Sequence, residues 1–109
     1  MPAVMEISVF PAGKKGASLG DVMVEVLKVA EKHGANYELT AMGTCLEGEL
    51  DALFAIAREM HEVCFELGYP RVLTTIRVDD RRDKALTMKY KVESVKEKLA
   101  KSALHISES

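Results

Sequence analysis

The sequence has no tryptophan and only two cysteines, Cys45 and Cys64, among its 109 residues. The cysteines do not form a CxxC pair, which favours a reducing cytoplasm over a disulfide framework. No apolar run approaches the roughly 20 residues that a transmembrane helix needs. The first residues, "MPAVMEISVFP", lack the basic start and the long apolar core of a signal peptide. We therefore expect a cytoplasmic protein that does not bind a membrane.

A strong charge of either sign is also missing. The formal net charge of −2 excludes the general electrostatic footprint of a nucleic-acid-binding protein. The charges are nevertheless unevenly distributed: residues 1–70 hold five basic and eleven acidic side chains, whereas residues 71–109 hold ten basic and six acidic ones. This polarity would allow the basic end of one copy to meet the acidic body of another.

Strand patterns are present in four segments. "AVMEISVFP" places Met5, Ile7 and Val9 on one face, which predicts a half-buried strand. "RVLTTIRVDD" is the most β-rich run of the chain and predicts a second one. Between them, "NYELTAM" and "TCLEGEL" predict a hairpin whose turn lies at residues 42–44.

Apolar residues recur at helical spacing in three segments, which predicts three helices. Ser18 is expected to cap the first helix, with Asp21 completing a capping-box arrangement, and Asp51 starts the second. The third runs from Tyr90 to about Ala103 and is expected to face three apolar side chains inward: Val92, Val95 and Leu99. The order β-α-β-β-α-β, followed by this extra helix, predicts an α+β fold in a single domain, 1–109. It is a ferredoxin-like sandwich with a four-stranded antiparallel sheet and two helices on one face.

The opposite face of that sheet has no helix of the split core to cover it. Side-chain alternation assigns to it the following residues: Glu6, Ser8, Phe10, Glu38, Thr40, Met42, Cys45, Glu47, Glu49, Leu73, Thr75, Arg77 and Asp79. This open face is too apolar for a solvated surface and too charged for a dry core. Two interpretations remain: a sheet-to-sheet dimer with charges paired at its rim, or a polar pocket within such an interface. Carboxylates and hydroxyls beside aromatic and sulfur groups suit a flat nitrogen heterocycle.

Catalytic and metal sites are not expected. The segment "DDRRDK" lacks the spacing of a calcium loop, and the three histidines have no zinc-ligand spacing. Cys45 has no histidine near it in this topology to activate the thiol. An acylphosphatase needs an arginine in the loop after the first strand, where this chain offers Lys14 and Lys15. An RNA-binding sheet needs exposed basic and aromatic residues where Glu6 and Glu47 stand.

Four segments together resemble the thiamine-binding protein family, the YkoF-like group of small ferredoxin-fold proteins in bacteria, archaea and fungi. They are "MEISVFP", "YELTAMGTCLEGEL", "VLTTIRVDDRRDK" and "KVESVKEKL", which span nearly the whole chain. The resemblance implies protomers that pair sheet to sheet, often as a dimer of dimers. It also implies binding of thiamine or its hydroxymethylpyrimidine moiety, with no catalysis, cofactor or metal. The alternative is an interaction module whose sheet face serves only assembly.

Within this resemblance, Glu47 is the central candidate for ligand binding. A buried carboxylate needs donors, and either Arg77 or an aminopyrimidine, through its amine and protonated ring nitrogen, would supply them. The remaining candidates form a polar rim, cover the ring or add charge: Ser8, Thr40 and Thr75 for the rim, Phe10 and Met42 for the cover, and Glu6 for charge.

Overall fold

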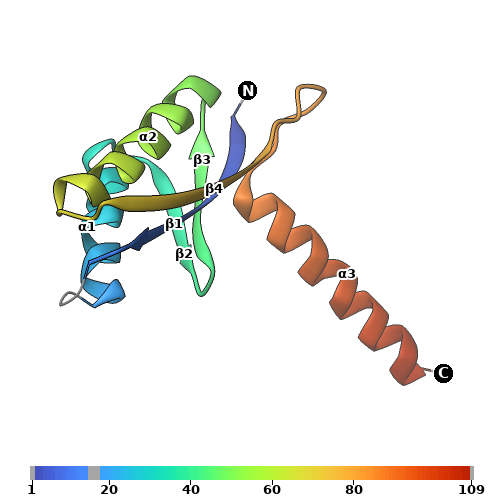
Figure 1. The fold of residues 1–109 in the computed structure, drawn as a ribbon. Coiled ribbons are helices and arrows are strands. Elements are labelled where there is room, and N and C mark those ends of the chain that lie inside the picture. Colours follow the sequence, from blue (N-terminus) through green and yellow to red (C-terminus); the bar gives the residue numbers. More distant parts are fainter. Residues whose placement is uncertain (1, 15–17, 109) are drawn as a thin grey trace.

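The computed structural model describes residues 2–14 and 18–108, with side chains through residue 103. The elements along the chain are β1 (Ala3–Ala12), α1 (Leu19–Lys32), β2 (Asn36–Thr40), β3 (Gly43–Gly48), α2 (Leu50–Glu66), β4 (Arg71–Asp79) and α3 (Met88–Glu108). The strands form one antiparallel sheet in the order β2-β3-β1-β4 (Figure 1). This arrangement confirms the ferredoxin-like fold with an additional C-terminal helix.

The core lies between the sheet and the pair α1 and α2. The predicted inward residues of β1 are 7% exposed or less. On α2 the buried residues recur at helical spacing: Leu53, Ile56, Ala57, Met60 and Cys64. The predicted cap of α1 is confirmed, because the Ser18 hydroxyl oxygen accepts a hydrogen bond from the Asp21 amide at 3.2 Å. No helix in the described part of the chain is long and apolar enough to cross a membrane.

The hairpin turn lies earlier than predicted. Thr40 pairs with Gly43, so the turn consists of residues 41–42, and residues 43–44 belong to β3. The Thr40 hydroxyl closes this turn: it donates to the Gly43 carbonyl oxygen at 3.1 Å and accepts from the Met42 amide at 3.2 Å. A Cβ atom at position 43 would lie 2.7 Å from the Ile7 carbonyl oxygen. Glycine is therefore required for the close approach of β3 and β1.

The start of α2 also differs from the prediction. The helix begins at Leu50, and Asp51 lies in its first turn rather than before it. Glu49 occupies the N-cap position, with an extended backbone at φ −66° and ψ 143°. It is thus not an open-face residue of β3, because the strand pairing ends at Gly48. The preference of helix starts for acidic residues explains why this boundary was misplaced by one residue.

The prediction that α3 faces its apolar stripe inward was wrong. The helix begins at Met88, two residues earlier than predicted, runs to Glu108 and leaves the body of the molecule (Figure 1). Among the described side chains of residues 80–103, Leu86 and Met88 alone are buried, both at 5% exposure. The predicted inward side chains Val92, Val95 and Leu99 are 46%, 65% and 68% exposed. They follow Met88 at alternating spacings of four and three residues and therefore lie on the same face of α3. Met88 packs on the sheet, and the rest of this apolar face extends past the edge of the sheet.

Candidate functional site

The open face of the sheet is organised in cross-strand rows. Starting at the end nearest α3, the strand register gives the rows Glu47–Val4–Asp79, Cys45–Glu6–Arg77, Ser8–Thr75 and Phe10–Leu73. The face therefore changes from acidic through hydroxyl-bearing to apolar along the strands. Each step of two residues advances about 7 Å, so the acidic and apolar rows lie roughly 20 Å apart. The face assignments made from alternation are confirmed for these residues.

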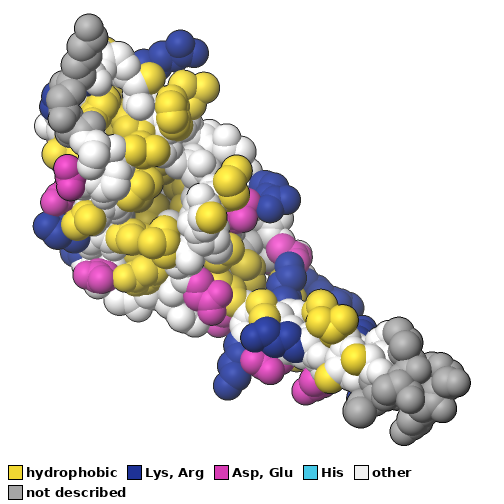
Figure 2. Space-filling model, turned by 90° about the horizontal axis from the view of Figure 1, so that it is seen from below, with side chains coloured by type: hydrophobic (Ala, Val, Ile, Leu, Met, Phe, Trp, Pro, Cys, Tyr) yellow, Lys and Arg dark blue, Asp and Glu magenta, His cyan; other side chains and the backbone are white. Residues whose placement is uncertain are grey.

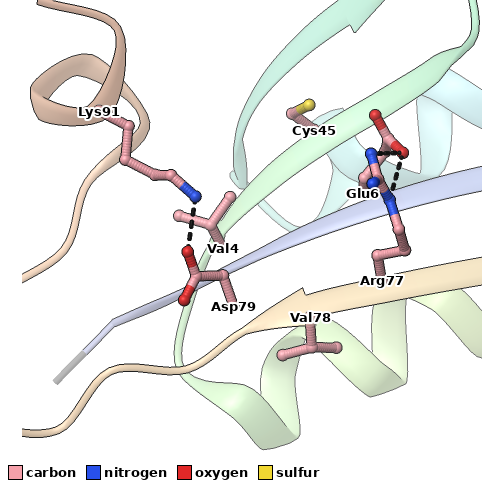
Figure 3. A pocket seen from close by; sticks show the side chains of 7 residues that line it. All are labelled: Val4, Glu6, Cys45, Arg77, Val78, Asp79 and Lys91. Atoms are coloured by element: carbon pink, nitrogen blue, oxygen red, sulfur yellow. Dashed lines mark hydrogen bonds and ion pairs between the residues drawn. The ribbon is translucent and has the colours of Figure 1, made fainter. Parts of the chain in front are cut away.

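The charge pairing within the second row was not predicted. Glu6 and Arg77 lie directly opposite each other on β1 and β4. Arg77 donates two hydrogen bonds to Glu6 Oε1, from Nε at 3.0 Å and from Nη2 at 2.8 Å (Figure 3). Within one chain Arg77 thus pairs with Glu6 and not with Glu47, for which it was one of two alternative sources of donors. Glu47 lies on β3, with β1 between it and β4, and in the neighbouring row, whereas Glu6 is the immediate cross-strand neighbour of Arg77.

Glu47 has a different partner. Its Oε2 accepts a hydrogen bond from the Met88 backbone N–H at 2.8 Å. Met88 is the first residue of α3, and the first N–H groups of a helix have no acceptor within the helix. A carboxylate at this end is also favoured by the helix dipole. The side chain is half-buried on the open face, as predicted, but it lies beneath the start of α3.

A hollow of about 380 Å³ lies between the open face and the first turn of α3 (Figure 3). Its lining comprises Val4, Glu6, Cys45, Arg77, Val78, Asp79 and Lys91. Lys91 extends from α3 and donates to Asp79 Oδ2 at 2.5 Å. Burial, together with the carboxylates of Glu6 and Glu38, raises the pKa of the Cys45 thiol. The hollow thus combines neutral apolar surface with carboxylates and two cationic side chains.

The other predicted site residues lie further along the sheet. A second hollow of about 330 Å³ near the hairpin includes Ser8, Phe10, Thr40 and Met42 in its lining. Thr75 lies opposite Ser8. Phe10 and Met42 are 54% and 81% exposed. The predicted set is therefore not brought together: Glu6 and Arg77 line the first hollow, four residues line the second, and Glu47 and Thr75 line neither. The roughly 20 Å between its ends exceeds what one heterocyclic ring can span within a single chain.

Five residues that line the first hollow were not among the predicted site residues: Val4, Cys45, Val78, Asp79 and Lys91. Cys45 and Asp79 had been assigned to the open face but not to the site. Val4 shares the face of Glu6 because the two are two positions apart on β1, and this alternation could have identified it. Lys91 had no comparable signal, because its place depends on where α3 starts and how it meets the sheet. Among the described residues, no group of three histidine, cysteine, aspartate or glutamate side chains could hold a metal ion.

Comparison with known proteins places this chain in a family. A sequence model of the thiamine-binding protein family matches residues 5–96. The chain belongs to the thiamine-binding protein family. The matched segment begins in β1 and ends in α3, so it includes the open face of the sheet and most of the residues that line the first hollow.

Relatives within the thiamine-binding protein family are similar along most of their length. The UPF0045 protein YqgV of Bacillus subtilis is 41% identical over 101 residues, which cover 89% of this chain and 97% of that protein. The crystal structure of a hypothetical protein from Methanocaldococcus jannaschii superposes with a TM-score of 0.80 at 33% identity, covering 88% and 97% of the two chains. A Thermotoga maritima structure, named as a candidate thiamine biosynthesis or salvage protein, shares the fold with a TM-score of 0.74 at 21% identity.

Proposed function

We propose that this protein binds thiamine or its hydroxymethylpyrimidine moiety without catalysing a reaction, and that the ligand occupies the hollow between the open sheet face and α3. Membership of the thiamine-binding protein family supports the ligand class. The observation that carries the location is the hollow of about 380 Å³, which falls within the usual size range of small-molecule sites.

The acidic row suits a two-ring ligand. Glu47 and Asp79 flank Val4 on the two neighbouring strands, so their backbones lie about 10 Å apart at the usual strand spacing. An aminopyrimidine over Val4 would donate its amine to the Glu47 carboxylate, and a thiazolium cation would lie near Asp79. Hydrogen bonds in which one partner is charged are stronger than neutral ones and fix orientation.

Self-association is part of the proposal. Phe10, Met42 and Leu73 are exposed at one end of the open face, and the apolar face of α3 is exposed as well. Figure 2 shows hydrophobic side chains both on the body of the molecule and along the projecting helix. Exposed apolar surface of this kind is typical of interfaces. In a sheet-to-sheet pair, the apolar row of a second copy could cover a ring that lies over the acidic row of the first.

Isothermal titration with thiamine, its hydroxymethylpyrimidine half and an unrelated heterocycle tests the binding proposal. We expect saturable heat from at least one of the first two ligands and a matching rise in melting temperature, because a ligand that binds only the folded state stabilises it. The unrelated heterocycle should give neither effect. Absence of heat and of thermal stabilisation with all three ligands would refute the proposal.

The alternative function is an interaction module whose sheet face serves only assembly. One observation favours it: each carboxylate of the acidic end already has a partner within the chain. Glu6 bonds Arg77, Glu47 bonds the Met88 amide and Asp79 bonds Lys91. A protein that self-associates but gives no heat with thiamine or its pyrimidine half would establish this alternative.

A further inference from the structure

The Lys91 ammonium already occupies the acidic end of the first hollow. Lys91 reaches from the first turn of α3 to Asp79, and both residues line the hollow (Figure 3). A positive charge from the chain itself thus lies where the proposed site would receive the positive charge of a ligand. The ion pair is accessible to solvent, since the two side chains are 45% and 49% exposed.

The remaining attachment of α3 does not depend on this ion pair. Leu86 and Met88 are buried, and the Met88 amide is held by Glu47. A second cap comes from Thr87, whose hydroxyl oxygen accepts a hydrogen bond from the Tyr90 amide at 3.0 Å. The start of the helix would therefore stay on the sheet if Lys91 were displaced from Asp79.

We propose that Lys91 is an internal competitor for the cationic part of the ligand: Asp79 favours positively charged thiamine over the neutral hydroxymethylpyrimidine, and Lys91 reduces that preference. This inference rests on the proposed function. A thiazolium ring replaces one cation at Asp79 by another, and the carboxylate keeps a partner throughout. A neutral pyrimidine cannot make this exchange, so it binds at Glu47 alone and leaves the ion pair in place.

The strength of the Lys91–Asp79 ion pair determines how far Lys91 can lower the affinity for a cationic ligand. Solvent-exposed ion pairs contribute little to stability, because water and salt screen them and two long side chains must be ordered. Such a contact reduces the apparent affinity of a competing cation by at most about fivefold. Lys91 is thus weak enough to be displaced by a ligand and strong enough for its removal to be measured.

Displacement also has a consequence for α3. When a cation takes Asp79, the first turn of the helix loses its ion pair to the sheet. Amide hydrogen exchange at residues 91–95 should therefore rise when thiamine binds, while the amide of Met88 stays protected by Glu47. Ligand binding would in this way loosen the helix whose apolar side chains are exposed to a partner.

The test compares Lys91→Met with Lys89→Met by isothermal titration of thiamine and of hydroxymethylpyrimidine. Lys89 is a neighbouring exposed lysine on α3 that does not line the first hollow, so its substitution makes the same change of charge elsewhere. We expect Lys91→Met to tighten thiamine binding by about twofold to fivefold and to leave pyrimidine binding unchanged. Lys89→Met should change neither, and Asp79→Asn should weaken thiamine binding while sparing the pyrimidine.

Several results would overturn the inference. Weaker or unchanged thiamine binding by a folded Lys91→Met variant would show that Lys91 does not compete, while the proposed function would stand. If Lys89→Met tightened thiamine binding as much as Lys91→Met, the gain in affinity would come from the change in net charge and not from the contact with Asp79. If the wild-type protein bound neither compound, the proposed function would fail, and the inference would fail with it. Hydrogen exchange without ligand gives an independent readout, because Lys91→Met should raise exchange at residues 91–95 and Lys89→Met should not.

Discussion

Glu47 accepts a hydrogen bond from the backbone of Met88, a residue 41 positions later in the chain. One side chain of β3 thus anchors the start of α3 on the otherwise open face of the sheet. This contact places the helix beside the first hollow and brings Lys91 to Asp79. The candidate ligand site and the attachment of the C-terminal helix therefore share the same acidic row.

Glu47→Gln should weaken thiamine binding by about tenfold or more, because it removes the charge from a proposed hydrogen bond to the aminopyrimidine. The glutamine oxygen can still accept from Met88, so α3 and the oligomer should persist. Titration calorimetry measures the affinity, with Glu38→Gln on neighbouring β2 as the control for lost charge. Equal affinity of Glu47→Gln and wild type would remove Glu47 from the site.

Phe10→Asp should disrupt self-association, because it introduces a charge into the exposed apolar row of the open face. Sedimentation velocity at micromolar concentration measures the assembly. Phe54→Asp is the matched control, since Phe54 is similarly exposed, at 47%, but lies on α2. A wild-type protein that sediments as a monomer, or two variants with the same effect, would contradict this prediction.

Deletion of residues 91–109 should change the oligomeric state more than the fold of the protomer. Up to residue 103, where side chains are described, the removed part of α3 contributes none to the buried core, while it carries the exposed Val92, Val95 and Leu99. Circular dichroism and sedimentation equilibrium measure the two effects separately. Retention of the wild-type assembly by the truncated chain would count against a role of α3 at an interface.

Gly43→Ala should destabilise the fold by about 1–3 kcal/mol, because the added methyl group would meet the Ile7 carbonyl oxygen at 2.7 Å. Gly48→Ala is the control: it lies on the same strand, and its nearest contact would be the Leu53 side chain at 3.7 Å. Urea unfolding gives both free energies. Equal stability of the two variants would show that β1 and β3 can separate without cost.

Cys45 should react slowly with thiol reagents at neutral pH, because burial and nearby carboxylates raise its pKa and so lower the fraction of thiolate below that of a free cysteine. The rate should increase as pH rises through this elevated pKa, and thiamine in the hollow should slow it further. Cys64, fully buried in the core, should not react in the folded protein. Mass spectrometry of timed alkylation follows both sites, and reaction of Cys45 unaffected by bound thiamine would place the ligand elsewhere.

The fold and the two faces of the first strand could be predicted from the amino-acid sequence. Alternation on β1 predicted which side chains pack against the helices, because a strand buried on one face has only one register that hides Met5, Ile7 and Val9. The helix stripe around Met60 was equally readable, since burial of a helix face follows its period. Boundaries were less certain, because Glu49 and Asp51 both suit a helix start.

The partners of the charged residues on the open face could not be predicted from the sequence, because they depend on how the strands are arranged. Alternation places Glu6, Glu47 and Arg77 on one side of the sheet, but strand order and register determine that Arg77 meets Glu6. The position of α3 depends on burial of Leu86 and Met88 and on the contact between Glu47 and the Met88 amide, which leave no mark in composition or periodicity. For the same reason Lys91 could not be assigned to the site: its role arises from where a projecting helix begins, and that is set by contacts between residues distant in the chain.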